Sequence, residues 1–218
     1  MKISFPSKTN LPSLQKIELQ NCIINTIDMS GLTSLKDIEI EGQWNNRNPR
    51  LIQITNGSFS GLSNLRRLKI KNVYFNQIPN ISGLTNLTNV TIEGRFRKAN
   101  IPIIEKEITS LTKLKRLNLE IKPPVGTNTL HVLPDFVTML PNLEYLNLKS
   151  SEISNIEGIH RLTKLKNIKA SKSALKKITK RPNNYIITKM IEKGLSKEDA
   201  IKIMAHSTST PTCQLRRF

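Results

Sequence analysis

The sequence is poor in the residues that build disulfide frameworks and aromatic cores. Of its 218 residues, two are cysteine and three are histidine, and aromatic residues make up 5% of the chain. Two cysteines exclude a framework of several disulfides, so a reducing compartment is the default expectation. The low aromatic content suits a solenoid, whose core is a column of aliphatic side chains.

Long apolar runs are absent as well. No stretch approaches the ~20 consecutive apolar residues of a membrane helix, so we expect no membrane span. Residues 1–6 lack the apolar run that follows the charge in a secretory signal peptide. We therefore expect a cytoplasmic protein. The Ile-, Asn- and Lys-rich composition is typical of AT-rich genomes, which makes a pathogen effector delivered into a host cell a second expectation.

Residues that carry chemistry are sparse. His131, His160 and His206 have no second candidate ligand at metal-binding spacing. No glycine-rich phosphate loop is present, and no general base can be assigned to Cys213 in the polar C-terminal tail. The sequence thus predicts a protein that is not an enzyme and has no catalytic, metal or cofactor site.

What the chain does contain is one short phrase, repeated seven times. The phrase is leucine, two residues, leucine, two residues, an aliphatic, one residue, an aliphatic. The copies begin at residues 11, 32, 62, 84, 111, 140 and 162. One copy cannot bury its own apolar face, so the copies must stack on one another.

This phrase resembles the leucine-rich repeat family. Two of the best copies begin Leu140-Pro-Asn-Leu-Glu-Tyr-Leu-Asn-Leu and Leu162-Thr-Lys-Leu-Lys-Asn-Ile-Lys-Ala. They are similar to the short subclass of about 22 residues found in cytosolic regulators and bacterial internalins. The resemblance implies an α/β solenoid, a horseshoe with a parallel concave β-sheet and short convex 3-10 or helical segments. It also implies a protein-binding scaffold, because most family members bind proteins.

The organisation along the chain follows from where the phrase begins and stops. We predict a short N-terminal segment over residues 1–10 and the repeat domain over residues 11–180. Residues 181–206 show two helical patterns, which predict a helical C-terminal cap over the last repeat or a docking arm. Residues 207–218 are predicted to be disordered. The short segments 102–109 and 134–140 each begin with proline and predict one short helix each.

Residues between the strand aliphatics must point away from the core, onto the concave face. On the second strand these are all acidic (Asp37, Glu39, Glu41), and on the third all basic (Arg67, Lys69, Lys71). Three interpretations are open: opposite charges that pair across strands, a solvated face, or a dipolar patch that orients a partner.

Three repeats are longer than the others, and their extra residues follow the strand. Two of these insertions share a pattern: Glu41-Gly42-Gln43-Trp44 and Glu93-Gly94-Arg95-Phe96. Each glycine can let the chain turn, and each pattern places an aromatic residue in the same register. Trp44 and Phe96 are either interface anchors beside arginine or core residues that fill a gap.

The net charge of +18 is uneven along the chain. Residues 61–122 carry 12 Lys/Arg and 4 Asp/Glu, residues 172–218 carry 11 and 3, and the remaining segments are nearly neutral. Basic blocks favour acidic partners, nucleic acid or anionic membrane surfaces, although such charge can also serve only solubility.

The leading hypothesis is therefore a monomeric, non-enzymatic scaffold that binds a protein partner through the concave sheet and the adjacent rim loops. Nucleic-acid or anionic-surface binding through residues 61–122 and the basic tail is the alternative. The predicted partner contacts are Asp37, Glu39, Glu41, Trp44, Arg67, Lys69, Lys71, Phe96, Arg116, Tyr145 and Lys149.

Overall fold

A computed structural model gives the fold of the repeats. It describes residues 2–4, 11–22, 26–42, 53–54, 58–75, 80–81, 83–96, 111–122, 133, 135–148, 153, 155–156 and 158–170. The predicted cap over 181–206, the predicted tail over 207–218 and the predicted helix over 102–109 lie outside these residues.

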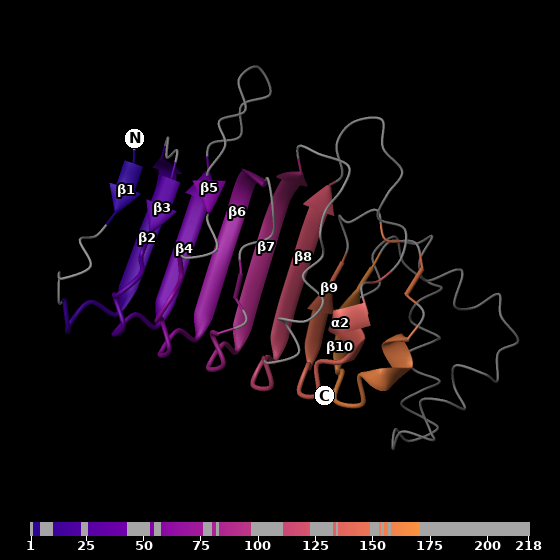
Figure 1. Ribbon diagram of the computed structural model, residues 1–218. Helices are drawn as coiled ribbons and strands as arrows, with labels where there is room; N and C mark the ends of the chain where they lie inside the picture. The colour runs from indigo at the N-terminus through magenta and orange to yellow at the C-terminus, as the bar shows by residue number, and fades with distance from the viewer. Residues whose placement is uncertain are drawn as a thin grey trace, which may run out of the picture.

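Each of the seven phrases supplies one strand of a single parallel sheet (Figure 1). The strands are β2 (Lys16–Cys22), β4 (Asp37–Gly42), β6 (Arg67–Phe75), β7 (Asn89–Phe96), β8 (Arg116–Lys122), β9 (Tyr145–Asn147) and β10 (Asn167–Lys169). Their order in the sheet is their order in the chain. A parallel sheet in chain order requires a return segment after every strand, which is the predicted repeat solenoid.

The two faces of the sheet differ as the sequence pattern requires. Along β4, buried residues alternate with half-buried ones, so that Ile38 and Ile40 face the core and Asp37, Glu39 and Glu41 face out. The strands are in register: Ile38 pairs with Leu68 on β6, which pairs with Val90 on β7. Equivalent aliphatics therefore stack in columns through the solenoid.

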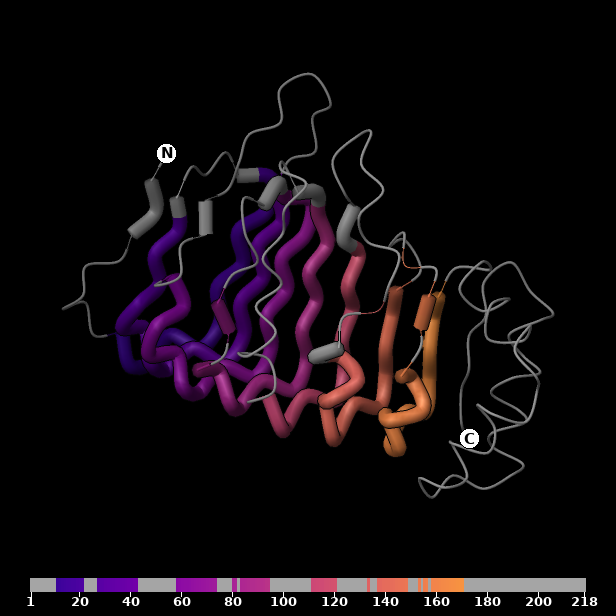
Figure 2. The backbone as a smooth tube through the Cα atoms, turned by 45° about the vertical axis from the view of Figure 1, so that its right-hand side comes forward, coloured from indigo at the N-terminus to yellow at the C-terminus, as the bar shows by residue number. Residues whose placement is uncertain are grey.

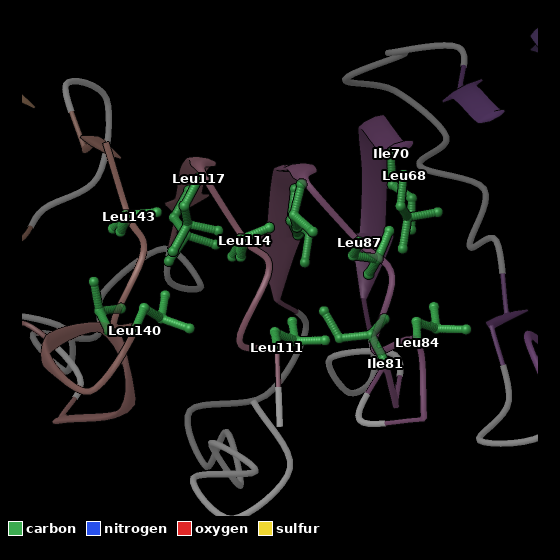
Figure 3. Packing of buried hydrophobic residues seen from close by; sticks show 14 of the residues in the cluster. Leu68, Ile70, Ile81, Leu84, Leu87, Leu111, Leu114, Leu117, Leu140 and Leu143 are labelled. Carbon is green, nitrogen blue, oxygen red and sulfur yellow. The ribbon is translucent and has the colours of Figure 1, made fainter. Parts of the chain in front are cut away.

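The core consists of these columns (Figure 3). Leu65, Leu68 and Leu87 are fully buried, and so are their counterparts in the fifth and sixth repeats. The column is less covered at its N-terminal end, where Leu11 is 40% exposed and Leu14 is half-buried. Burial of one such leucine contributes roughly 1.5–3 kcal/mol of transfer free energy, so the interior repeats contribute most of the stability.

The convex side is β-structured in its N-terminal part. β1 (Lys2–Ser4), β3 (Thr26–Asp28) and β5 (Gln53–Ile54) form a second, three-stranded parallel sheet. The family resemblance implied 3-10 or helical segments on this side, and residues 1–10 were predicted only as a short N-terminal segment. The β-branched residues Ile3, Ile27 and Ile54, which occupy matching rungs of this sheet, favour the extended conformation.

The later repeats return through short helical turns, as expected. α2 (Asp135–Thr138) follows Pro134 and the 3-10 helix η1 (Ile159–Arg161) precedes the seventh phrase. Figure 2 shows these turns beside the C-terminal strands of the sheet. No helix within the described residues is long and apolar enough to cross a membrane.

The turn that leads into each strand is tied to the turn of the preceding repeat. The third position of the phrase is asparagine in three repeats, and each asparagine donates its amide to a carbonyl one repeat earlier. The bonds run from Asn64 to Thr33 (2.9 Å), from Asn86 to Ser63 (2.7 Å) and from Asn142 to Thr112 (2.6 Å). This asparagine ladder aligns the turns in one row along the sheet margin.

A bulge interrupts β6 at Asn72, which has a φ of 53°. The register shifts between Ile70 and Val73, and the carbonyl of Asn72 approaches Gly42 on β4. Asparagine tolerates the left-handed region better than most residues with a Cβ, and its side chain donates to Glu41 Oε1 at 3.0 Å. Gly42 therefore permits a close approach between strands rather than a turn.

Replacing Asn72 by alanine should lower the free energy of unfolding by about 1–2 kcal/mol, because alanine resists a positive φ. The change also removes the hydrogen bond to Glu41. Glycine at position 72 should cost less, since it adopts this conformation without strain. Urea denaturation of both variants checks the order, and an alanine variant as stable as the glycine variant would contradict it.

Candidate interaction surface

The concave face is charged but electrically balanced. Among the outward side chains that the structure describes on the seven strands, six are cations and six are anions. The cations are Lys16, Arg67, Lys69, Lys71, Arg116 and Lys169, and the anions are Glu18, Asp37, Glu39, Glu41, Glu93 and Glu120. The balance of charge over these twelve side chains suits a protein partner better than a polyanion.

The acidic second strand and the basic third strand pair with each other. Arg67 Nη1 lies 3.3 Å from Asp37 Oδ2, and Lys69 forms an ion pair with Glu39. Both pairs follow the strand register, in which these residues are direct neighbours. Partly exposed pairs of this kind contribute at most about 1 kcal/mol each. The pairing interpretation is therefore correct for these four residues.

The third expected pair is replaced by two other contacts. Lys71 turns to the next strand, where its Nζ lies 3.1 Å from Glu93 Oε2, while Glu41 accepts a hydrogen bond from Asn72. The bulge at Asn72 changes which side chains meet beyond Ile70. The sequence pattern did not predict that Lys71 pairs with Glu93 instead of Glu41, because this change depends on one residue with a positive φ.

The first strand carries a local pair of its own. Lys16 binds Glu18 within β2. The hydrogen bond and the charge of Glu18 raise the pKa of Lys16, and the same contact lowers the pKa of Glu18. Both groups stay ionised near neutral pH. The N-terminal half of the concave face thus satisfies its charges internally.

The C-terminal part of the face is different. Tyr145 on β9 lies between two cations: the guanidinium carbon of Arg116 is 4.9 Å from the ring centroid and Lys169 Nζ is 6.0 Å from it. Arg116 on β8 is the direct register partner of Tyr145, and Lys169 lies on the next strand, β10, opposite Asn147. Neither cation has a carboxylate partner among the described residues.

Two amide oxygens beside Tyr145 are also unmatched. Asn118 Oδ1 and Asn167 Oδ1 are buried atoms without a hydrogen-bond donor, whereas the amide nitrogen of Asn118 donates to Glu93 Oε1 at 2.6 Å. Asn167 is the direct neighbour of Tyr145 on β10. We call this cluster the Tyr145 patch; it comprises Arg116, Asn118, Tyr145, Asn167 and Lys169.

The structure brings together part of the predicted contact set. Asp37, Glu39, Arg67 and Lys69 form the ion-paired region, while Arg116 and Tyr145 lie in the Tyr145 patch. Trp44 and Lys149 lie outside the described residues. The backbone of Phe96 pairs with Phe75 at the end of β7, and its side chain is not described, so the choice between anchor and core stays open.

Three members of the Tyr145 patch were missing from the predicted contacts: Asn118, Asn167 and Lys169. The strand alternation places all three on the outward face, so the signal was present. What singles them out is the lack of a partner charge or donor, and only the side-chain arrangement reveals that. Among the described residues, no group of three potential ligands could hold a metal ion.

Comparisons with known proteins give one clear result, a shared architecture. No protein-family model and no curated protein matches the chain. An internalin, InlF, from Listeria monocytogenes is similar with a TM-score of 0.51 at 22% identity, over 74% of this chain and 45% of the internalin. The Leptospira interrogans LRR protein LIC12759 is similar with a TM-score of 0.53 at 19% identity, over 80% and 45%. The chain thus spans less than half the length of either structure.

Proposed function

We propose that this chain, which has the leucine-rich repeat fold, is a non-enzymatic scaffold that binds a protein partner through its concave face. The observation that carries the proposal is the Tyr145 patch, in which Arg116 and Lys169 flank an aromatic ring and have no carboxylate partner among the described residues. A partner's carboxylate can therefore meet these two cations without breaking an internal ion pair. The fold shared with an internalin and a Leptospira LRR protein is compatible with this role.

The dimensions of the face support a protein-sized partner. Seven strands at about 4.8 Å spacing give a surface roughly 30 Å long, which is enough for a standard interface of about 800 Å² per partner. Tyrosine and arginine are the residues most enriched among those that dominate binding energy. Tyr145 and Arg116 are therefore the anchors that we propose, with Lys169 adding polar specificity.

The ion-paired residues receive a different role. Asp37, Glu39, Arg67 and Lys69 compensate one another, so a partner would gain little from meeting them. We propose that they fix the shape of the N-terminal half and align the partner. The rim residues Trp44 and Phe96, together with Lys71, Glu41 and Lys149, stay predicted contacts at the margin of the site.

We also propose that the chain is a monomer located in the cytoplasm, or in the host cell if it acts as an effector. A monomer leaves the concave face open, and size-exclusion chromatography with light scattering tests that state. Fractionation of cells that express the tagged chain tests the location.

The function is tested by affinity capture from a lysate with the intact chain and a variant carrying Tyr145→Ala and Arg116→Gln. A protein captured by the intact chain at 0.15 M and 0.5 M salt, in the presence of nuclease, is then purified. Its affinity for the variant should fall at least about thirtyfold, because the loss of a central anchor typically costs 2 kcal/mol or more. Titration calorimetry measures the ratio.

The matched control replaces a compensated pair, with Glu39→Gln and Lys69→Gln in one chain. This variant keeps the net charge and neutralises two outward side chains that compensate each other, so its affinity should change less than about threefold. Capture that disappears with nuclease or at the higher salt would refute the scaffold and favour the nucleic-acid alternative. Equal losses in both variants would refute the Tyr145 patch as the anchor.

A further inference from the structure

The structure places six cations on a surface other than the concave face. The turns that lead into the seven strands lie in register, one per repeat, along one margin of the sheet (Figures 1 and 2). We call this margin the ascending edge; it comprises the second, third and fifth residue of each phrase. Its cations are Lys36, Arg66, Lys113, Lys115, Lys164 and Lys166, and its one anion is Glu144.

All six cations of the ascending edge are exposed. Lys115 and Lys166 share Glu144, whose pKa their hydrogen bonds and charges lower. The other four, Lys36, Arg66, Lys113 and Lys164, have no carboxylate partner among the described residues. The edge therefore carries a net charge of +5, beside a concave face whose twelve described charged side chains sum to zero.

Three of the four uncompensated cations are lysines that neutral groups hold in place. Lys113 Nζ donates to Asn86 Oδ1 at 2.6 Å and Lys164 Nζ donates to Asn142 Oδ1 at 2.5 Å, so both bind the asparagine ladder. Lys36 Nζ donates to Gln15 Oε1 at 3.2 Å. An amide oxygen positions an ammonium group without cancelling its charge, so these bonds hold the cations in a row.

The form of this row distinguishes between polyanions. Single-stranded nucleic acid is bound by cations together with aromatic platforms, and the ascending edge has no aromatic residue at any of its positions. A straight row of cations laid along a nucleic-acid duplex would meet each phosphate strand only once per helical turn of about 34 Å, so it would contact few phosphates. A flat anionic surface offers a headgroup to every turn at once.

An apolar side chain accompanies the charges. Met139 is 54% exposed and is one of two large apolar side chains that are exposed among the described residues. It lies at the end of α2, in the turn closed by the hydrogen bond from Leu140 N to Val137 O, and immediately precedes the turn that carries Asn142. An exposed methionine directly before one turn of the ascending edge suits the boundary between headgroups and acyl chains.

We propose that the ascending edge is a docking surface for the anionic face of a lipid bilayer. The cations of the ascending edge contact the headgroups, and Met139 enters the boundary between headgroups and acyl chains. The sheet is oriented with this edge toward the bilayer. Because the concave face lies on different residues, it stays open to a protein partner while the edge is bound. The function is peripheral, reversible membrane attachment and is independent of the partner proposed above.

The test measures partition of the full chain onto vesicles of 70% phosphatidylcholine and 30% phosphatidylserine, and onto pure phosphatidylcholine, at 0.1 M salt. The edge variant carries Lys36→Gln, Arg66→Gln, Lys113→Gln and Lys164→Gln. The control carries Lys172→Gln, Lys176→Gln, Lys177→Gln and Lys180→Gln, which removes the same charge from residues beyond the described repeats. A basic residue near an anionic surface is worth roughly fivefold, so the edge variant, which lacks four of them, should bind about 600-fold more weakly than the intact chain.

The control variant should retain most of the binding, and Met139→Ser should weaken it severalfold. Equal losses in the edge variant and the control, or no preference for the phosphatidylserine vesicles, would overturn the proposal. A 20-mer DNA duplex and a 20-mer single strand form the comparison arm. If either binds more tightly than the vesicles and loses its binding in the edge variant, the edge is a nucleic-acid surface instead. Unchanged urea midpoints would exclude unfolding as the cause of a loss.

Discussion

Replacing Gly42 by alanine is expected to destabilise the chain by about 3 kcal/mol, although it adds a single methyl group. A Cβ at this position would lie 2.4 Å from the carbonyl oxygen of Asn72 and 3.2 Å from Val73 Cγ1. The carbonyl belongs to the bulge of β6, and β6 is hydrogen-bonded on both sides, to β4 and to β7. Neither strand can move away without disturbing its ladder. Urea denaturation followed by circular dichroism measures the loss.

Gly83 provides the matched control, since a Cβ there meets no atom within 4 Å and its φ is not positive. Gly83→Ala should change the free energy of unfolding by less than about 1 kcal/mol and should stabilise if anything, because alanine restricts the unfolded chain. If Gly42→Ala were as mild as Gly83→Ala, the close approach between β4 and the bulge would be wrong.

Leu65→Ala should cost 2–5 kcal/mol, through lost apolar burial and the cavity that remains. Leu65 is fully buried in the third repeat, between the equivalent leucines of the second and fourth repeats. Because the third repeat stacks against both of these neighbours, a cavity at Leu65 weakens two interfaces between repeats rather than one. The urea midpoint should fall, and the transition should broaden if the two halves of the solenoid separate.

Leu14 occupies the same position of the phrase in the first repeat, where it is half-buried. The same substitution there removes fewer contacts and leaves an open site rather than a closed cavity, so Leu14→Ala should cost less than half as much. Comparable losses at the two positions would mean that the N-terminal end of the column is covered as well as its centre.

The repeat pattern predicted the strands well, because strand alternation and stacking are local consequences of the phrase. Residues such as Ile38 and Leu68 had to face inward once the copies stacked, since a strand turns successive side chains to opposite faces. The convex side was predicted less well. Segments such as Thr26–Asp28 and Gln53–Ile54 are too short for a pattern, and their pairing joins residues that are far apart in the sequence.

Pairing of opposite charges was predicted where it depends only on register. Asp37 faces Arg67 and Glu39 faces Lys69, as the neighbouring phrases require. Lys71 was the exception, because the bulge at Asn72 lies between its position and the next rung. A single residue with a positive φ changed a contact that the phrase alone could not specify.

The candidate site, too, was predicted only in part from the sequence. The sequence placed Arg116 and Tyr145 on the outward face, but it did not reveal that their neighbours Asn118 and Asn167 have unmatched oxygens. Likewise, the basic block over residues 61–122 is a property of the sequence, whereas its division between two surfaces is not. Register places Arg67, Lys69, Lys71 and Arg116 on the concave face and Arg66, Lys113 and Lys115 on the ascending edge.

The sequence by itself therefore determined the repeat architecture, the number of strands in the concave sheet and the face of each strand residue. These depend on a period of leucines that every copy repeats. Only the tertiary structure decided which charges cancel and which stay available, since that depends on neighbours about 20 to 30 residues away in the chain. The Tyr145 patch and the ascending edge are the groups left unmatched after those contacts form.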